Sequence, residues 1–150
     1  MSTLYTPEML ALATELARYP LNGSFAYQAD VRSKVCGSTL SIGLDCDAKG
    51  AVSRIGLKVS ACAVGQSSAA ILAQSVQGVT AQDLTRTHAA LRDWLAGKGA
   101  LPDWPGLATL SSARERAGRH GALLLPWEAA LQALSASDCA GDLSSQSASR

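Results

Sequence analysis

The chain has 150 residues, of which 47% are hydrophobic and 17% charged, with a formal net charge of +1 at pH 7. This length and composition predict a single globular domain with its own core. The near-neutral charge excludes a general nucleic-acid binder, and no apolar run approaches the ~20 residues of a membrane span. Because the first residues also lack the pattern of a signal peptide, we expect a cytoplasmic protein whose four cysteines are free or bind a metal.

The first expected elements are a helix and a strand. Thr6 suits an N-cap and Pro7 the first helical position, so a helix is predicted up to Arg18. Residues 24–32 then alternate between apolar and polar side chains, with Phe25 expected on the apolar face. This alternation predicts the first strand.

Two more strands are expected over residues 39–45 and 54–60, where apolar residues again alternate with polar or small ones. Between them, residues 47–50 contain an Asp and a Gly that favour a tight turn. Three strands joined by short connections predict an antiparallel meander.

The rest of the chain is expected to be helical, and four segments carry helical patterns: 63–77, 80–97, 107–116 and 121–134. Pro126 predicts a kink or a restart inside the last of them. Residues 135–150 are rich in Ser and Ala and are expected to form a disordered tail, which leaves a folded domain over 1–134. Strands followed by helices predict an α+β fold, in which an N-terminal helix and several C-terminal helices pack on one face of a three-stranded sheet.

Cys36 and Cys62 are related by the predicted hairpin, since each lies 13 residues from Lys49. An antiparallel hairpin that turns there returns both thiols to the same end of the sheet. Cys62 also precedes a helix, whose N-terminus favours the thiolate that binds metals and attacks sulfur. The alternative is that both cysteines are small core residues. Cys46 is expected at the far end of the hairpin and Cys139 in the tail.

A histidine could complete such a site. His120 lies between two glycines at the start of the last apolar helix, where it is either a structural residue or a ligand. His88, in the middle of a helix, is expected to be a surface or edge residue. Two thiolates near a histidine suit zinc or an iron–sulfur cluster. Asp45 and Asp47 are expected in the turn region rather than at this site.

This order of elements resembles the U-type iron–sulfur cluster assembly scaffolds, the family of IscU, SufU and the N-terminal domain of NifU. The matching residues are Val35-Cys36-Gly37, the segment SACAVGQSSA over 60–69, and Arg119-His120 before an apolar helix. The likeness covers roughly residues 4–134. It implies a scaffold that is not an enzyme, binds iron and sulfide at Cys36, Cys62 and His120, and passes clusters to apo-proteins.

The same resemblance implies the partners and the cargo. A cysteine desulfurase would deliver persulfide sulfur, apo iron–sulfur proteins would receive the cluster, and neither nucleic acid nor a membrane is involved. An iron–sulfur cluster is expected, with the 2Fe-2S form favoured, or else zinc. Ser38 and Arg119 are expected around the ligands, Ser38 as a hydroxyl near a thiolate or a bound water and Arg119 as a charge near an anionic cluster.

Two positions depart from the family pattern. Ser38 stands where the family usually has an aspartate, and Gly121 stands where the family has a third cysteine, its usual acceptor of sulfur. With three ligands left, a fourth could come from elsewhere, such as a second subunit of a homodimer. Otherwise the site binds only zinc, or sulfur is accepted at Cys36 or Cys62.

Two other functions stay open. One is a zinc-containing sulfur acceptor that activates a desulfurase without assembling a cluster, and the other is a degenerate scaffold fold kept as a protein-binding module. A cysteine–histidine hydrolase is disfavoured, because the sequence offers neither an orienting acid nor an oxyanion loop.

Overall fold

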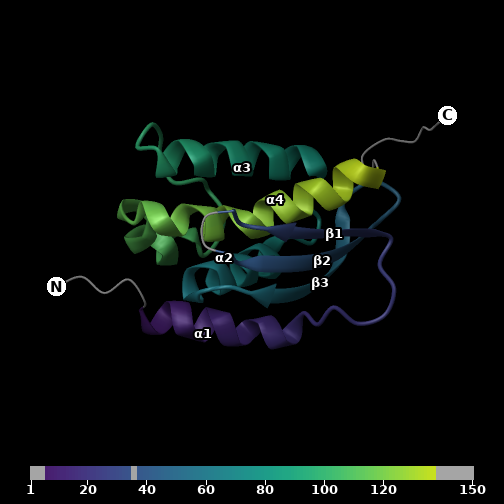
Figure 1. The fold of residues 1–150 in the computed structure, drawn as a ribbon. Coiled ribbons are helices and arrows are strands. Elements are labelled where there is room, and N and C mark those ends of the chain that lie inside the picture. The colour runs from purple at the N-terminus through teal and green to yellow at the C-terminus, as the bar shows by residue number, and fades with distance from the viewer. Residues whose placement is uncertain (1–5, 35–36, 138–150) are drawn as a thin grey trace.

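The computed structural model describes residues 6–34 and 37–137 (Figure 1). The predicted α+β fold is confirmed. In chain order its elements are α1 (Pro7–Glu15), η1 (Leu16–Arg18), β1 (Tyr27–Arg32), β2 (Thr39–Cys46), β3 (Val52–Ser60), α2 (Ala63–Ser75), α3 (Ala81–Leu95), η2 (Leu107–Glu115), η3 (Ala117–Arg119) and α4 (His120–Ser137), where η marks a 3-10 helix.

The three strands form an antiparallel sheet in the order β1-β2-β3, as the meander predicted. The turn between β2 and β3 also lies where the sequence placed it. The N–H of Gly50 donates to the Asp47 carbonyl at 3.0 Å, and Gly50 has a φ of 84°, a conformation that favours glycine. The Asp47 carboxylate accepts bonds from the N–H groups of Lys49 and Ala51.

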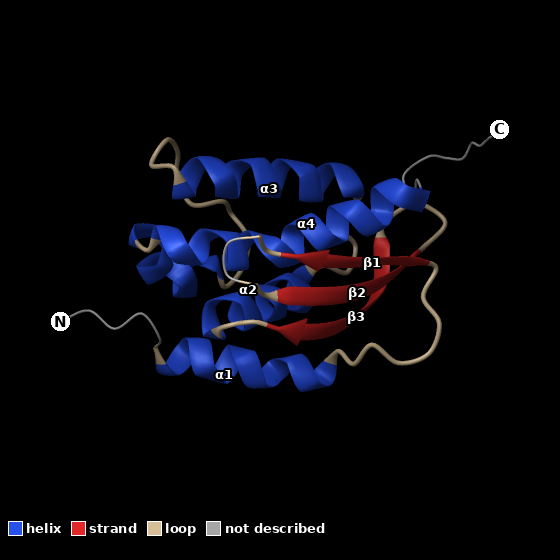
Figure 2. Cartoon of the chain, in the orientation of Figure 1, coloured by secondary structure: helices blue, strands red, loops and turns tan. Residues whose placement is uncertain are grey.

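Helices α2 and α4 cover one face of the sheet, while α1 packs against α2 and α3 packs against α4 (Figure 2). The central strand contributes Leu40, Ile42 and Leu44 to the core, each at most 2% exposed. Helix α2 is buried along most of its length, which explains why its sequence is apolar or small almost all round. It is therefore the central helix of the fold.

Phe25 does not follow the predicted alternation. It lies before β1, and its ring covers the outer face of the sheet, where a Cβ on Gly43 or Gly56 would come within 2.6 Å of ring atoms. Gly43 and Gly56 are cross-strand partners, so two facing glycines make room for one aromatic ring. Placing Phe25 on the apolar face was wrong because the chain enters β1 irregularly, only at Tyr27.

The last helix is longer than expected and does not restart at Pro126. Helix α4 runs without a restart from His120 to Ser137 with Pro126 inside it, so it extends three residues past the predicted boundary at Leu134. Proline removes only the one hydrogen bond that its N–H would have given to the carbonyl of Ala122. Buried side chains on both sides of Pro126 hold the helix in place. In the part of the chain that the structure describes, no helix is both long enough and apolar enough to cross a bilayer.

Candidate metal centre

The strand register gathers several predicted site residues at one end of the sheet. Thr39, the first residue of β2, pairs with Arg32 at the end of β1 and with Ser60 at the end of β3. Cys62 follows Ser60 by two residues. The hairpin therefore brings the start of β2 and the Cys62 segment together, as the sequence predicted.

The loop between β1 and β2 lies at this same end. Its base is closed by the N–H of Ser33, which donates to the Ser38 carbonyl at 2.8 Å, and by the N–H of Gly37, which donates to the Ser33 carbonyl at 3.1 Å. Cys36 itself lies outside the described residues. Its predicted position beside Cys62 therefore remains a prediction, and only the flanking Gly37 and Ser38 can be placed.

Cys62 is the N-cap residue of α2, with extended backbone angles of φ −67° and ψ 172°. Its side chain makes no capping hydrogen bond, it is half-buried, and among the described cysteines it is the free one. Its place at a helix N-terminus confirms the prediction. Cys46, in contrast, is disulfide-bonded, so its sulfur is not the free or metal-bound thiol that the sequence suggested.

The Cys62 segment borders an open hollow of about 310 Å³ with a mainly polar lining. The lining residues are Gly37, Ser38, Ser60, Ala61, Cys62 and Arg119. Three of the predicted site residues, Ser38, Cys62 and Arg119, thus share one surface. The hollow offers a thiol, a guanidinium and a hydroxyl to whatever enters it.

His120 begins α4, directly after Arg119, and is not among the residues that line this hollow. Its Nε2 lies 2.7 Å from the Arg114 carbonyl oxygen. A carbonyl can only accept, so this contact requires the proton on Nε2 and leaves the lone pair of a neutral ring on Nδ1. Metal-binding histidines are commonly oriented in this way, by a carbonyl that holds the other ring nitrogen.

Close packing sets the distance between α2 and α4 at the site. A Cβ on Gly65 would lie 2.8 Å from the Cβ of Ala61 and 3.4 Å from both the Cβ and the carbonyl oxygen of Ala122. Only glycine lets the first turn of α2 approach the first turn of α4 this closely. The sequence could not identify Ala122 as the residue that faces Gly65.

Two buried serines connect α2 to its neighbours. The Ser67 hydroxyl donates to the Met9 carbonyl of α1 at 2.7 Å, and the Ser68 hydroxyl donates to the Leu123 carbonyl of α4 at 2.6 Å. Both serines are 0% exposed, so each polar group needs its partner. Ser67 and Ser68 therefore fix α2 between α1 and α4.

The position of the missing third cysteine faces the loop between β1 and β2. An ideal Cβ on Gly121 would lie 3.0 Å from the Ser33 hydroxyl oxygen, and Ser33 is only 7% exposed. A side chain at position 121 would thus enter between α4 and this loop, where Ser33 must give way. Sequence reasoning did not single out Ser33, because nothing in its immediate neighbourhood marks it.

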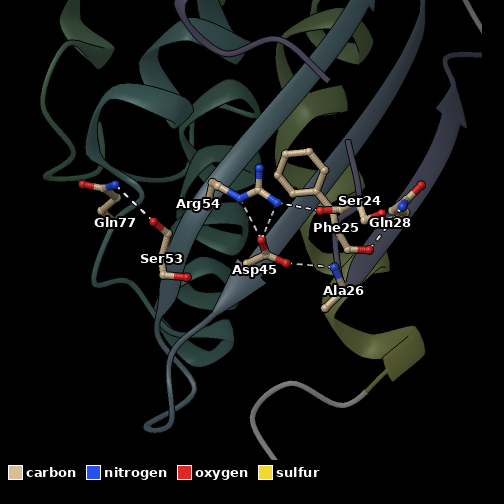
Figure 3. Close-up of polar contacts among 8 residues, drawn as sticks. All are labelled: Ser24, Phe25, Ala26, Gln28, Asp45, Ser53, Arg54 and Gln77. Atoms are coloured by element: carbon tan, nitrogen blue, oxygen red, sulfur yellow. Dashed lines mark hydrogen bonds and ion pairs between the residues drawn. The ribbon is translucent and has the colours of Figure 1, made fainter. Parts of the chain in front are cut away.

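The remaining candidates have structural partners. The Asp45 carboxylate accepts a 2.8 Å bond from the N–H of Ala26 and pairs with Arg54, whose guanidinium lies 4.0 Å from the centre of the Phe25 ring (Figure 3). Asp45 thus has partners next to β1 and on β3, which fits its expected place in the hairpin. His88, on α3, contacts Glu128 of α4 at 3.2 Å.

No group of three or more Cys, His, Asp or Glu side chains able to hold a metal occurs over residues 6–34 and 37–137. The predicted set needs Cys36 as its third member, and that residue lies outside those ranges. Cys62 and His120 have the donor types that zinc and iron–sulfur clusters take, so the described part of the set suits such a group.

A scan against protein-family models finds no match, and a search of curated proteins finds none either. Solved structures do match. A nitrogen-fixing NifU-like protein (N-terminal part) from Brucella abortus is 28% identical, with a TM-score of 0.81 over 88% of this chain and 92% of that one. A protein named as an iron–sulfur cluster assembly scaffold for the SUF system, from Fervidobacterium islandicum AW-1, is 14% identical, with a TM-score of 0.78 over 87% of this chain and 96% of that one.

Proposed function

We propose that this chain, whose resemblance to the U-type iron–sulfur cluster assembly scaffolds is confirmed by a shared fold, is itself such a scaffold. It holds iron and sulfide at Cys36, Cys62 and His120 and passes the cluster to apo-proteins. One observation supports this most directly: the free Cys62 and Arg119 share one hollow, and the residue after Arg119 is a histidine with Nδ1 left to bind a metal.

The chemistry of these residues fits the cargo. Thiolate and imidazole donors suit iron–sulfur clusters as well as zinc. Thiolates and bridging sulfides add negative charge, which the nearby guanidinium of Arg119 offsets. Ser38 is 6% exposed and lines the hollow, and its proposed role is that of a hydroxyl near a thiolate or a bound water.

In this proposal the protein works as a carrier rather than an enzyme. A cysteine desulfurase supplies the sulfur, an apo iron–sulfur protein takes the cluster, and a fourth ligand comes from a partner or a second subunit. The cytoplasmic location and the favoured 2Fe-2S form remain predictions from the sequence.

The second candidate is a zinc-containing sulfur acceptor that activates a desulfurase. The observation in its favour is that position 121 is a glycine and offers no third thiol. The Ser33 hydroxyl oxygen lies 3.0 Å from where a Cβ of residue 121 would be. Two cysteines and one histidine form a familiar zinc site with an open fourth position.

Anaerobic reconstitution with ferrous iron and sulfide, followed by iron and sulfide analysis and a visible spectrum, tests the proposal. We expect wild type to bind a cluster, and Cys36→Ala, Cys62→Ala and His120→Ala each to lose it. His88→Ala is the matched control, because it removes the other histidine without touching the proposed site. Binding of zinc alone would favour the second candidate, and a cluster that survives Cys62→Ala would refute both.

A further inference from the structure

The outer face of the sheet, opposite α2 and α4, carries polar side chains next to the Cys62 hollow. The register puts two rows of cross-strand neighbours there, Arg32, Thr39 and Ser60 in the first and Asp30, Ser41 and Lys58 in the second. Arg32, Lys58, Asp30 and Ser60 are exposed. The polar outer face therefore adjoins the Cys62 hollow at Ser60, which belongs to both.

A second hollow of about 250 Å³ lies on these rows, lined by Asp30, Val31, Arg32, Thr39, Leu40 and Ser41. Thr39 borders it and is also the strand partner of Ser60, which lines the Cys62 hollow. The two hollows thus adjoin across β2. Together they offer an extended track of polar groups from Cys62 to β1.

Positive charge is concentrated around this track. Arg32 and Lys58 are exposed in the two rows, and Arg119 lines the Cys62 hollow. Lys34 is exposed in the loop after β1 that contains Gly37 and Ser38, and Arg116 is exposed three residues before Arg119, whose N–H donates to its carbonyl. Within the described ranges none of these five cations forms an ion pair, whereas Arg18, Arg54 and Arg86 each pair with a neighbouring carboxylate. The carboxylates nearest to the five in the chain are Asp30 and Glu115. A chain of net charge +1 thus carries more cations than carboxylates at the end of the sheet near Cys62.

We propose that this face, defined by Arg32, Lys34, Lys58, Arg116 and Arg119, docks an extended acidic segment of a partner protein. Carboxylates would meet the five cations, and the hydroxyls of Thr39, Ser41 and Ser60 would donate to the segment in the track. Such complementarity speeds association and selects the partner.

A protein segment fits this face better than a nucleic acid does. The net charge of the chain is only +1, and Asp30, in the second row, lines the second hollow, where it would repel an evenly charged phosphate backbone. The inference rests on the proposed function, because a segment docked along the track would reach the Cys62 hollow, where the cluster is proposed to bind. The charge argument itself does not depend on which metal binds there.

The test uses a fluorescently labelled peptide of about ten residues in which Glu alternates with Ser, measured by anisotropy against the full-length protein. We expect wild type to bind it and to lose affinity as salt is raised. Lys58→Glu should weaken binding several-fold, and Arg32→Glu/Lys58→Glu by about tenfold or more. Lys49→Glu is the matched control, since Lys49 is an exposed lysine in the turn of the same hairpin, at the opposite end of the sheet.

Equal binding by wild type and the double variant, or no binding by wild type, would overturn the inference, as would tighter binding of a short DNA duplex. If the double variant misfolds by circular dichroism, Arg32→Gln/Lys58→Gln replaces it. Cobalt binding to the same proteins separates the two proposals. If the double variant binds cobalt but not the peptide, the docking surface is supported independently of the metal site. If Cys62→Ala binds the peptide normally but not cobalt, the docking surface is again supported, and the loss is confined to the metal site.

Discussion

The indole Nε1 of Trp127 donates a 2.9 Å hydrogen bond to the hydroxyl of Ser68, and both residues are 0% exposed. The same hydroxyl donates onward to the Leu123 carbonyl. Ser68 belongs to α2, which begins beside Cys62, and Trp127 belongs to α4, which begins at His120. A buried polar chain therefore joins the two helices that carry the candidate ligands.

Ser68→Ala should destabilise the fold by about 1–3 kcal/mol, because it leaves the Trp127 Nε1 and the Leu123 carbonyl without their partner in the core. Urea denaturation followed by tryptophan fluorescence measures the loss. Ser53→Ala, at an exposed position on β3, is the control and should stay within about 0.5 kcal/mol of wild type. A Ser68→Ala protein as stable as wild type would show that the bond contributes nothing.

Gly65→Ala should weaken metal binding, because the added methyl would press against Ala61 and Ala122 and push the Cys62 segment away from the start of α4. The overpacking itself should cost about 1–3 kcal/mol of stability. Gly118→Ala is the control, since nothing lies within 4 Å of a Cβ there. Zinc titration in competition with a chelator compares the two variants, and equal zinc affinity would contradict the role given to Gly65.

Gly121→Cys should add a thiolate to the metal site once the Ser33 hydroxyl moves aside. Bound cobalt reports this directly, because thiolate-to-cobalt charge-transfer absorption grows with the number of sulfur ligands. Gly121→Ala adds the same Cβ without the sulfur and should leave the spectrum of wild type unchanged. Identical spectra for the two variants would place position 121 outside the site.

Stability should fall on acidification partly through Asp45. The hydrogen bond from the N–H of Ala26, and then the Arg54 guanidinium, hold the pKa of the Asp45 carboxyl below its usual value, against the opposing effect of partial burial. Since the folded state has the lower pKa, this stabilisation is fully present above the ordinary carboxyl pKa of about 3.9 and is lost as the pH falls through the lowered value.

Asp45→Asn should therefore be less stable than wild type at neutral pH, and the difference should shrink as the pH falls through that acidic range. Urea denaturation at a series of pH values measures it, with Asp103→Asn in an exposed loop as the control. A difference that does not change with pH would mean that Asp45 acts through shape rather than charge.

Local patterns were enough for the strands, the turn and most helices. Alternation predicted β2 and β3, and Asp47 with Gly50 predicted the turn, because each signal lies within the segment that it describes. The predictions for Phe25 and Pro126 failed because the causes of the observed structure lie outside the local segment. Two facing glycines on β2 and β3 make room for Phe25 on the outer face, and buried contacts with other elements hold α4 in one piece through Pro126. Both causes lie far away in the sequence.

The fold class, the position of Cys62 at a helix start and the resemblance to the scaffold family could all be predicted from the sequence, because they depend on periodicity, capping and short motifs. Three contacts could be seen only in the folded structure: Arg119 shares a hollow with Cys62, the Arg114 carbonyl accepts from Nε2 of His120, and Ser33 faces Gly121. Contacts of this kind join separate elements of the fold. Their geometry follows from packing and strand register, which no local pattern of residues encodes.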